Sequence, residues 1–303
     1  MPPLDFDALW DYQHPDQTEA AFRQLLPQAE RNHDSSYHLQ LLTQIARTQG
    51  LQRQFVEAHH TLDKVKQHLR PELVISTIRY LLERGRVFNS SGQPAQAQIW
   101  FQQAWELACQ HQEGAFFAVD AAHMLAITGS SFEEKNAWNT TALHSALAST
   151  DEQVRGWCGS LYNNLGWTYH DQGAYERALE HFQQALDWQQ EHGPTREIRI
   201  ARWCVGRTLR SLQRTAEALA LQEELLTEWE KSAEKQDGYV FEEIAECLLI
   251  LGRVPESRPY FAQAYALLSQ DRWLVNQEQE RLLRLKQLSE ESEEASISQE
   301  PEP

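Results

Sequence analysis

The residues with the greatest capacity for chemistry in this sequence are its 12 histidines and 44 acidic residues. None of them falls into a familiar catalytic or metal-binding spacing. His59 and His60 are adjacent, so on a helix they point about 100° apart and cannot bind one metal ion together. Glu242, Glu243 and Glu246 form an acidic helical face, but no third group supports acid–base chemistry there. HExxH, GxSxG, GxxxxGK[ST] and GxGxxG are also absent. We therefore expect no enzyme activity, no cofactor and no metal site.

The cysteines give the same answer, because they lie more than 40 residues apart and form no CxxC pair. In chain order they are Cys109, Cys158, Cys204 and Cys247. Each stands among apolar neighbours in a stretch of helical periodicity. We therefore expect four buried free thiols rather than a metal site or disulfides.

Composition and charge narrow the class of protein further. With 303 residues, 41% of them hydrophobic, and only 13 glycines and 11 prolines, the chain favours long helices around a sizeable core. The net charge of −17 disfavours nucleic acid and anionic membranes as partners, because both repel an acidic surface. No run approaches the ~20 apolar residues of a membrane span. The acidic start MPPLDFDALWD is unlike a signal peptide, so we expect a cytoplasmic protein.

The elements that position these side chains follow from a repeat of roughly 40 residues. Its clearest copy is LYNNLGWTYHDQGAYERALEHFQQA, residues 161–185. The residues that define this copy are Gly166, Tyr169, Gly173, Ala178, Phe182 and Ala185. The corresponding residues upstream are Gly85, Phe88, Gly92, Ala97, Phe101 and Ala104. Looser copies contain Gly206 and Ala245, and divergent copies include Leu42, Ala46 and Gly50 or span 118–148.

This pattern resembles the tetratricopeptide repeat (TPR) family, whose motif is a helix–turn–helix with small and aromatic residues at fixed offsets. The resemblance implies an all-α fold, a right-handed superhelical solenoid of stacked helix–turn–helix repeats, in a long-repeat variant. Small residues such as Gly166 and Ala178 let the two helices approach, and Gly173 suits a left-handed turn. We expect an N-terminal helical hairpin or cap at 1–33 and about six repeats over 34–271. A capping helix is expected at 272–288 and a disordered acidic tail at 289–303.

In this family the first helix of each hairpin lines the concave groove. The resemblance therefore implies a set of inward-facing groove residues, which we predict to bind the ligand: Arg79, Arg86, Asn89, His123, Asn163, Trp167, His170, Trp203, Arg207 and Arg210. Arginine binds carboxylates through two hydrogen bonds, and tryptophan offers area with little rotamer entropy to lose. We therefore expect a peptide or protein partner that carries acidic groups or a free carboxylate. The family's own carboxylate clamp uses Lys and Asn; Asn163 matches in type, but the lysines are missing.

The favoured function is a non-catalytic interaction scaffold or adaptor, a monomer or a dimer, that binds a peptide or protein segment in this groove. One alternative is a regulatory sensor that binds a short peptide and changes its superhelical pitch, and another is an enzyme-associated assembly factor. A structural interpretation also stays open. Groove residues of repeat proteins pack against each other, and Arg–Glu pairs can bridge adjacent hairpins.

Overall fold

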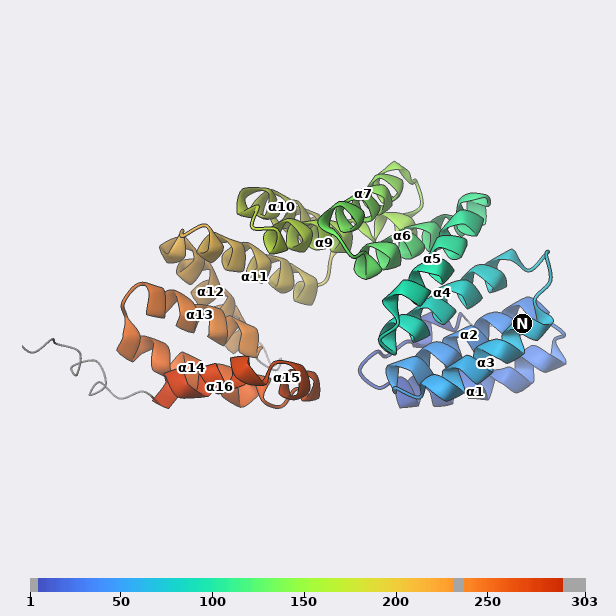
Figure 1. Ribbon diagram of the computed structural model, residues 1–303, viewed down its shortest axis with the longest axis horizontal. Helices are drawn as coiled ribbons and strands as arrows, with labels where there is room; N and C mark the ends of the chain where they lie inside the picture. The colour runs from blue at the N-terminus through green and yellow to red at the C-terminus, as the bar shows by residue number, and fades with distance from the viewer. Residues whose placement is uncertain (1–4, 232–236, 291–303) are drawn as a thin grey trace, which may run out of the picture. The chain divides into compact units, whose positions relative to one another are not determined.

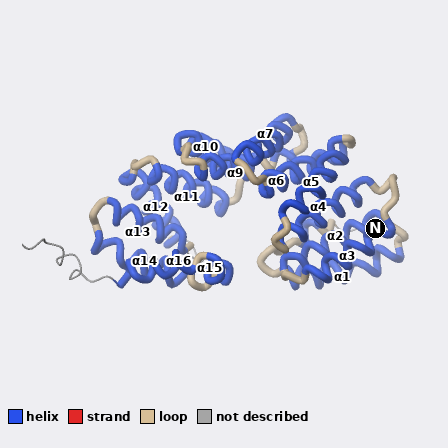
Figure 2. Tube along the Cα trace, in the orientation of Figure 1, coloured by secondary structure: helices blue, strands red, loops and turns tan. Residues whose placement is uncertain are grey.

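The fold is all-α, as the sequence predicts. The computed structural model describes residues 5–231 and 237–290 (Figure 1). Within these ranges the regular secondary structure consists of helices, with no strand (Figure 2). The chain divides into two compact units, Met1–Leu161 and Tyr162–Pro303, here called unit 1 and unit 2, and the boundary falls inside one helix.

Unit 1 is a series of helix–turn–helix hairpins. Its helices are η1 (Asp7–Leu9), α1 (Pro15–Arg31), α2 (Ser35–Leu51), α3 (Phe55–His68), α4 (Val74–Ser90), α5 (Pro94–Cys109), η2 (Gln112–Gly114), α6 (Ala115–Thr128), α7 (Phe132–Ala148) and α8 (Glu152–Arg155). The hairpins are α2–α3, α4–α5 and α6–α7, and their first helices contact one another in the order α2, α4, α6. The short η1 and the longer α1 precede the first hairpin, and α1 packs on α2.

Unit 2 repeats this plan. Its helices are α9 (Cys158–Asp171), which begins just before the boundary, α10 (Tyr175–His192), α11 (Thr195–Ser211), α12 (Thr215–Glu230), α13 (Gly238–Ile250), α14 (Val254–Leu268), α15 (Arg272–Gln277) and α16 (Gln279–Glu290). The hairpins are α9–α10, α11–α12 and α13–α14, and α16 packs on α14.

The C-terminal region has two helices where the sequence suggests one. The predicted cap at 272–288 corresponds to α15 and α16, because the backbone leaves the helical conformation at Glu278, with φ −127° and ψ 43°. The predicted tail begins at residue 289, but α16 continues to Glu290. Residues 291–303 of that predicted tail lie outside the described part of the chain.

The turns inside the hairpins explain why some copies of the repeat are hard to see in the sequence. Gly92, Gly173 and Gly252 have φ of 82°, 79° and 74°, a left-handed conformation that glycine adopts without a steric cost. The turns of α2–α3 and α11–α12 have the same conformation at Arg53 and Gln213, each with φ 62°. Because these two hairpins lack the glycine, their repeats match the motif poorly although the backbone is alike.

Close packing of the two helices in a hairpin depends on a glycine opposite a phenylalanine. A Cβ atom on Gly85 would lie 2.4 Å from the ring of Phe101, and one on Gly166 would lie 2.5 Å from Phe182. Both rings are fully buried in the hydrophobic core of their unit. The glycines therefore let each ring lie directly against the backbone of the first helix.

Candidate functional site

The residues predicted to bind a ligand lie on the first helices of the hairpins, and the structure divides them between the two units. In unit 1 they are Arg79, Arg86 and Asn89 on α4 and His123 on α6. In unit 2 they are Asn163, Trp167 and His170 on α9 and Trp203, Arg207 and Arg210 on α11. They therefore form two separate sets.

In unit 1, Arg86 binds two buried carboxylates. One terminal nitrogen donates to Glu83 Oε1 at 2.6 Å, and the other donates to both oxygens of Asp120 at 2.5 and 2.6 Å. Burial alone would raise the pKa of Asp120, but the charges of Arg86 and Arg47 outweigh it and lower this pKa. Asp120 is therefore held as an anion that neutralises the arginine.

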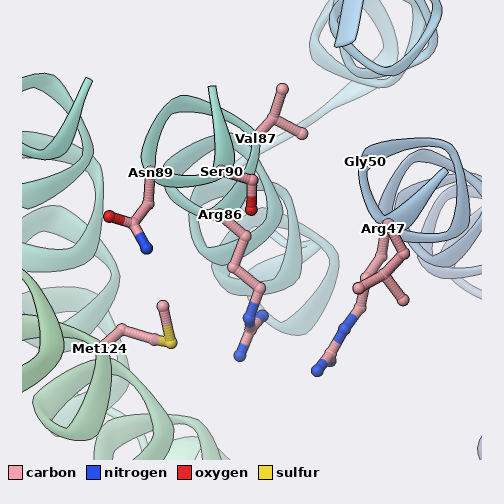
Figure 3. A pocket seen from close by; sticks show the side chains of 8 residues that line it. Arg47, Gly50, Arg86, Val87, Asn89, Ser90 and Met124 are labelled. Atoms are coloured by element: carbon pink, nitrogen blue, oxygen red, sulfur yellow. The ribbon is translucent and has the colours of Figure 1, made fainter. Parts of the chain in front are cut away.

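A small pocket opens beside this network, between α2, α4 and α6. It has a volume of about 150 Å³, and Arg47, Arg86, Asn89 and Met124 are among its lining residues (Figure 3). Figure 3 shows the two arginine side chains extending in the same direction in this view. Predicted residues Arg86 and Asn89 are thus brought together, and Arg47 joins them.

The other two predicted residues of unit 1 have different surroundings. The His123 ring centroid lies 5.3 Å from that of Trp157, and burial lowers the pKa of the imidazole, so it is neutral near pH 7. Arg79 forms an ion pair with Asp7 and lies over the ring of Phe6, at 5.2 Å from its centroid. A segment from the beginning of the chain therefore covers the Arg79 side chain, which is only 13% exposed.

In unit 2, three aromatic residues form a row across successive first helices. The ring of Trp167 on α9 lies 6.0 Å from that of Trp203 on α11, which in turn lies 5.9 Å from the ring of Tyr239 on α13. Trp203 Nε1 donates to the carbonyl oxygen of Tyr239 at 3.2 Å. All three are partly exposed. His170 stands beside the row, with its ring 5.1 Å from Trp167.

Next to this aromatic row, two arginines share one acid. Arg210 makes a bidentate pair with Glu243 at 2.7 and 2.9 Å, and Arg207 Nε lies 3.1 Å from the same carboxylate. Glu243 is 5% exposed, whereas Arg207 is 27% exposed. Two guanidinium groups against one carboxylate leave this trio with one net positive charge.

The histidine and asparagine of unit 2 are also engaged within the protein. His170 Nε2 lies 3.0 Å from the Ser211 hydroxyl, and burial together with the charge of Arg207 lowers its pKa. Asn163 Oδ1 accepts a hydrogen bond from the Cys204 thiol at 3.3 Å. Burial raises the pKa of Cys204 to about 12, so this thiol remains protonated.

One contact between consecutive first helices recurs through the chain. An arginine directly after the small residue of one hairpin meets an acid two residues before the small residue of the next, and we call this the inter-repeat ion pair. The pairs are Arg47–Glu83 at 3.7 Å, Arg86–Asp120 at 2.5 Å and Arg207–Glu243 at 3.1 Å. Between α9 and α11, Trp167 and Cys204 occupy the two equivalent positions, so this junction has no ion pair there. The predicted arginines Arg86, Arg207 and Arg210 thus hold repeats together, which is the structural interpretation that the sequence left open.

Sequence reasoning missed the partners of these arginines. It identified Glu242, Glu243 and Glu246 as an acidic face, with Glu242 and Glu246 at inward positions, but assigned them no partners. Glu242 and Glu243 are buried, and Glu242 pairs with Arg281 on α16. Arg47 was also missed, although it follows Ala46 as Arg86 follows Gly85. That shared register is the signal that could have found it.

The remaining histidines and cysteines of the described residues differ in their neighbours and their burial. In the described ranges, no group of three or more His, Cys, Asp and Glu side chains is placed to hold a metal ion. Three cysteines are buried as expected, but Cys109 is exposed, because it ends α5 at the surface. His59 is partly buried, and its Nδ1 lies 2.8 Å from a nitrogen of the buried Arg84. No helix of the described residues is long and apolar enough to cross a bilayer.

These features define a helical-repeat protein. Residues 160–187 match the family model of the tetratricopeptide repeat, and the described residues have a TPR-like fold. A search of curated protein sequences gives no significant match.

Solved structures with a similar fold are distant in sequence. The apo form of RapI is 13% identical, with a TM-score of 0.70, and the match covers 96% of this chain and 81% of RapI. NprR in complex with its cognate peptide NprX is 18% identical, with a TM-score of 0.56, covering 92% of this chain and 81% of NprR. BtubC from P. vanneervenii is 14% identical, with a TM-score of 0.61, and the match covers 74% of this chain and 94% of BtubC. At these identities the likeness concerns the fold.

Proposed function

We propose that this protein is a non-catalytic interaction module that binds a peptide or protein segment on the first-helix face of unit 2. The observation that carries the proposal is the row of Trp167, Trp203 and Tyr239 beside the Arg207–Arg210–Glu243 trio. Partly exposed aromatic side chains in a row offer contact area to apolar side chains of an extended segment. The row lies on three consecutive first helices, which matches the length of an extended peptide better than that of a small metabolite.

The charge beside the row suggests what else the segment carries. The trio has one net positive charge, and Arg207 is its most exposed member. A carboxylate of the ligand, from an acidic side chain or a free C-terminus, would complete the neutralisation through the exposed guanidinium. We therefore expect the ligand to place a single carboxylate here, because Glu243 already neutralises one of the two arginine charges.

The experiment is a selection of peptides from a random library on the purified chain, followed by fluorescence anisotropy with the selected peptide. We expect Trp167→Phe and Arg207→Gln each to weaken binding at least 10-fold, about 1.4 kcal/mol. Trp273→Phe and Arg214→Gln are matched controls, since both residues are exposed in unit 2 and lie outside the row and the trio. Binding that the first two variants leave intact would refute the proposed site.

A regulatory sensor is a second candidate, and one contact favours it. Arg207 belongs both to the proposed binding face and to the inter-repeat ion pair with Glu243 on α13. A ligand carboxylate that draws Arg207 away would loosen the contact between α11 and α13. Among the structural relatives, NprR has been solved with a cognate peptide. For a sensor, the selected peptide should change the small-angle scattering radius, whereas an unchanged radius would favour a rigid adaptor.

A further inference from the structure

The beginning of the chain lies across the first helices of unit 1. We call residues 5–12 the N-terminal segment. Its Trp10 and Tyr12 rings stack with centroids 4.8 Å apart and planes 8° apart. The guanidinium carbon of Arg47, on α2, lies 5.3 Å from the first ring centroid and 5.4 Å from the second. Trp10 Nε1 also donates to the side chain of Gln44 at 3.2 Å. The α2 face therefore holds two aromatic rings through one arginine.

A second arginine holds the acidic part of the same segment. Both carboxylate oxygens of Asp7 accept hydrogen bonds from the guanidinium of Arg79, on α4. The Arg79 guanidinium carbon also lies over the rings of Phe6 and Phe117, at 5.2 and 5.1 Å from their centroids. The geometry combines a bidentate ion pair with cation–π contacts, which are the two interactions that arginine makes best.

Both arginines occupy positions that face the groove by the repeat register. Arg79 was predicted to face inward from the sequence, and Arg47 directly follows the small residue Ala46, as the inward-facing Arg86 follows Gly85. The N-terminal segment therefore lies where a ligand of these two repeats would lie. It lies on the surface of the unit, since Tyr12 is 57% exposed and the Asp7 side chain 45% exposed. Phe6, by contrast, is buried in the core.

We propose that this α2–α4 face is a binding surface for an acidic, aromatic-rich peptide segment of a partner, and that the chain's own N-terminal segment occupies it until such a partner displaces it. The contacts of the N-terminal segment show which side chains this face binds. An acid pairs with Arg79, and two aromatic side chains two residues apart stack against Arg47. This surface belongs wholly to unit 1, so the proposal is independent of the binding site proposed in unit 2.

The strength of the competition follows from the tether. A short tether presents the segment at an effective concentration of about 1 mM. If the same sequence as a free peptide binds the open face with a Kd of about 10 µM, the closed form outnumbers the open form about 100 to 1. The free peptide should then bind the wild-type chain about 100-fold more weakly than a chain whose own segment cannot bind.

The test uses the full chain with Asp7→Ala, Trp10→Ala and Tyr12→Ala together, called the opened variant, which keeps Phe6 in the core. The probe is the fluorescent, acetylated and amidated peptide DFDALWDYQ, which corresponds to residues 5–13. Fluorescence anisotropy should show binding to the opened variant at least 10-fold tighter than to the wild-type chain. In the opened variant, Arg47→Ala and Arg79→Ala should each weaken this binding at least 10-fold. Arg53→Ala, at an exposed turn, is the matched control and should leave it unchanged.

Three results would overturn the proposal. The first is no binding to an opened variant whose circular dichroism spectrum matches that of the wild type, which would make the segment a structural cap only. The second is equal binding to the wild-type and opened chains, or binding that both arginine variants leave unchanged. The third is a wild-type mass of twice 35.1 kDa in solution that falls to one chain in the opened variant, since the segment would then serve a second copy.

Discussion

Glu243 offers the sharpest test of how the repeats hold together. Its side chain is 5% exposed and receives Arg210 at 2.7 and 2.9 Å and Arg207 at 3.1 Å from the preceding repeat. Glu243→Gln keeps the shape but removes the charge, so two guanidinium groups would face each other without a counter-ion. We expect the free energy of unfolding to fall as a result.

The expected loss follows from burial. Removing one partner of a fully buried ion pair costs about 3–5 kcal/mol, because the remaining charge stays desolvated. Arg207 and Arg210 are 27% and 17% exposed, so water screens part of this penalty, and we expect a loss of about 2–3 kcal/mol. Glu256→Gln is the control, because Glu256 and its partner Arg253 are 55% and 43% exposed, so water screens the charges of this surface pair.

Urea unfolding followed by far-UV circular dichroism measures both variants. With a typical m-value of about 2 kcal/mol per molar urea, Glu243→Gln should lower the midpoint by about 1 M and Glu256→Gln by less than about half of that. Combining Glu243→Gln with Arg210→Gln should cost less than the sum of the two single changes, because the second change removes a charge that the first has stranded. Equal midpoints for Glu243→Gln and Glu256→Gln would show that the inter-repeat ion pair does not stabilise the stack.

Three further predictions concern the hairpins and two partly buried histidines. Gly166→Ala should lower the free energy of unfolding by about 2 kcal/mol or more, and with it the melting temperature, because the new Cβ would lie 2.5 Å from Phe182. A melting temperature within one degree of the wild-type value would contradict this packing. Gln213→Gly should raise the free energy of unfolding by about 0.5–1 kcal/mol, and with it the melting temperature, since it relieves a left-handed backbone at φ 62°. A lower melting temperature by calorimetry would show that this turn is unstrained. Burial lowers the pKa of His123 and His170 below 6.5 in the folded chain, so the unfolded chain binds protons first and stability falls as pH decreases through 6.5. Thermal melts at pH 7.5 and 5.5 measure this loss of stability, and His170→Gln should make the loss smaller. If the difference in stability between His170→Gln and the wild type were the same at both pH values, the prediction would be contradicted.

The hairpins could be predicted because each repeat residue has a local packing reason. Gly85 and Gly166 admit a phenylalanine ring, and Gly173 takes a left-handed turn, so the sequence pattern and the structure agree there. Arg53 and Gln213 adopt the same turn without glycine, and tertiary packing rather than residue preference sets their conformation. The sequence pattern is therefore weakest where the backbone is strained.

The surroundings of the predicted binding residues could not be predicted in the same way. A register of positions indicates that Arg86 and Arg207 face inward, but not that Asp120 and Glu243 on the next helix reach them. Those acids stand at a position normally assigned to packing, and their pairing depends on the distance between consecutive hairpins. The contact of Arg79 with Asp7 joins residues 72 positions apart in the sequence and is not part of the repeat pattern.

The two positions of the inter-repeat ion pair also determine which hairpins can stand next to each other. Most modules of this kind are interchangeable in principle, since neighbours meet through similar apolar surfaces. Here a duplicated α4–α5 hairpin would fit beside its original, because Arg86 of one copy would face Glu83 of the next. A duplicated α9–α10 hairpin inserted before α13 would instead press Trp167 against the buried Glu243. The residues at this pair of positions therefore restrict the order of the hairpins. A rearrangement that places an aromatic residue opposite the buried acid leaves that acid without a counter-ion.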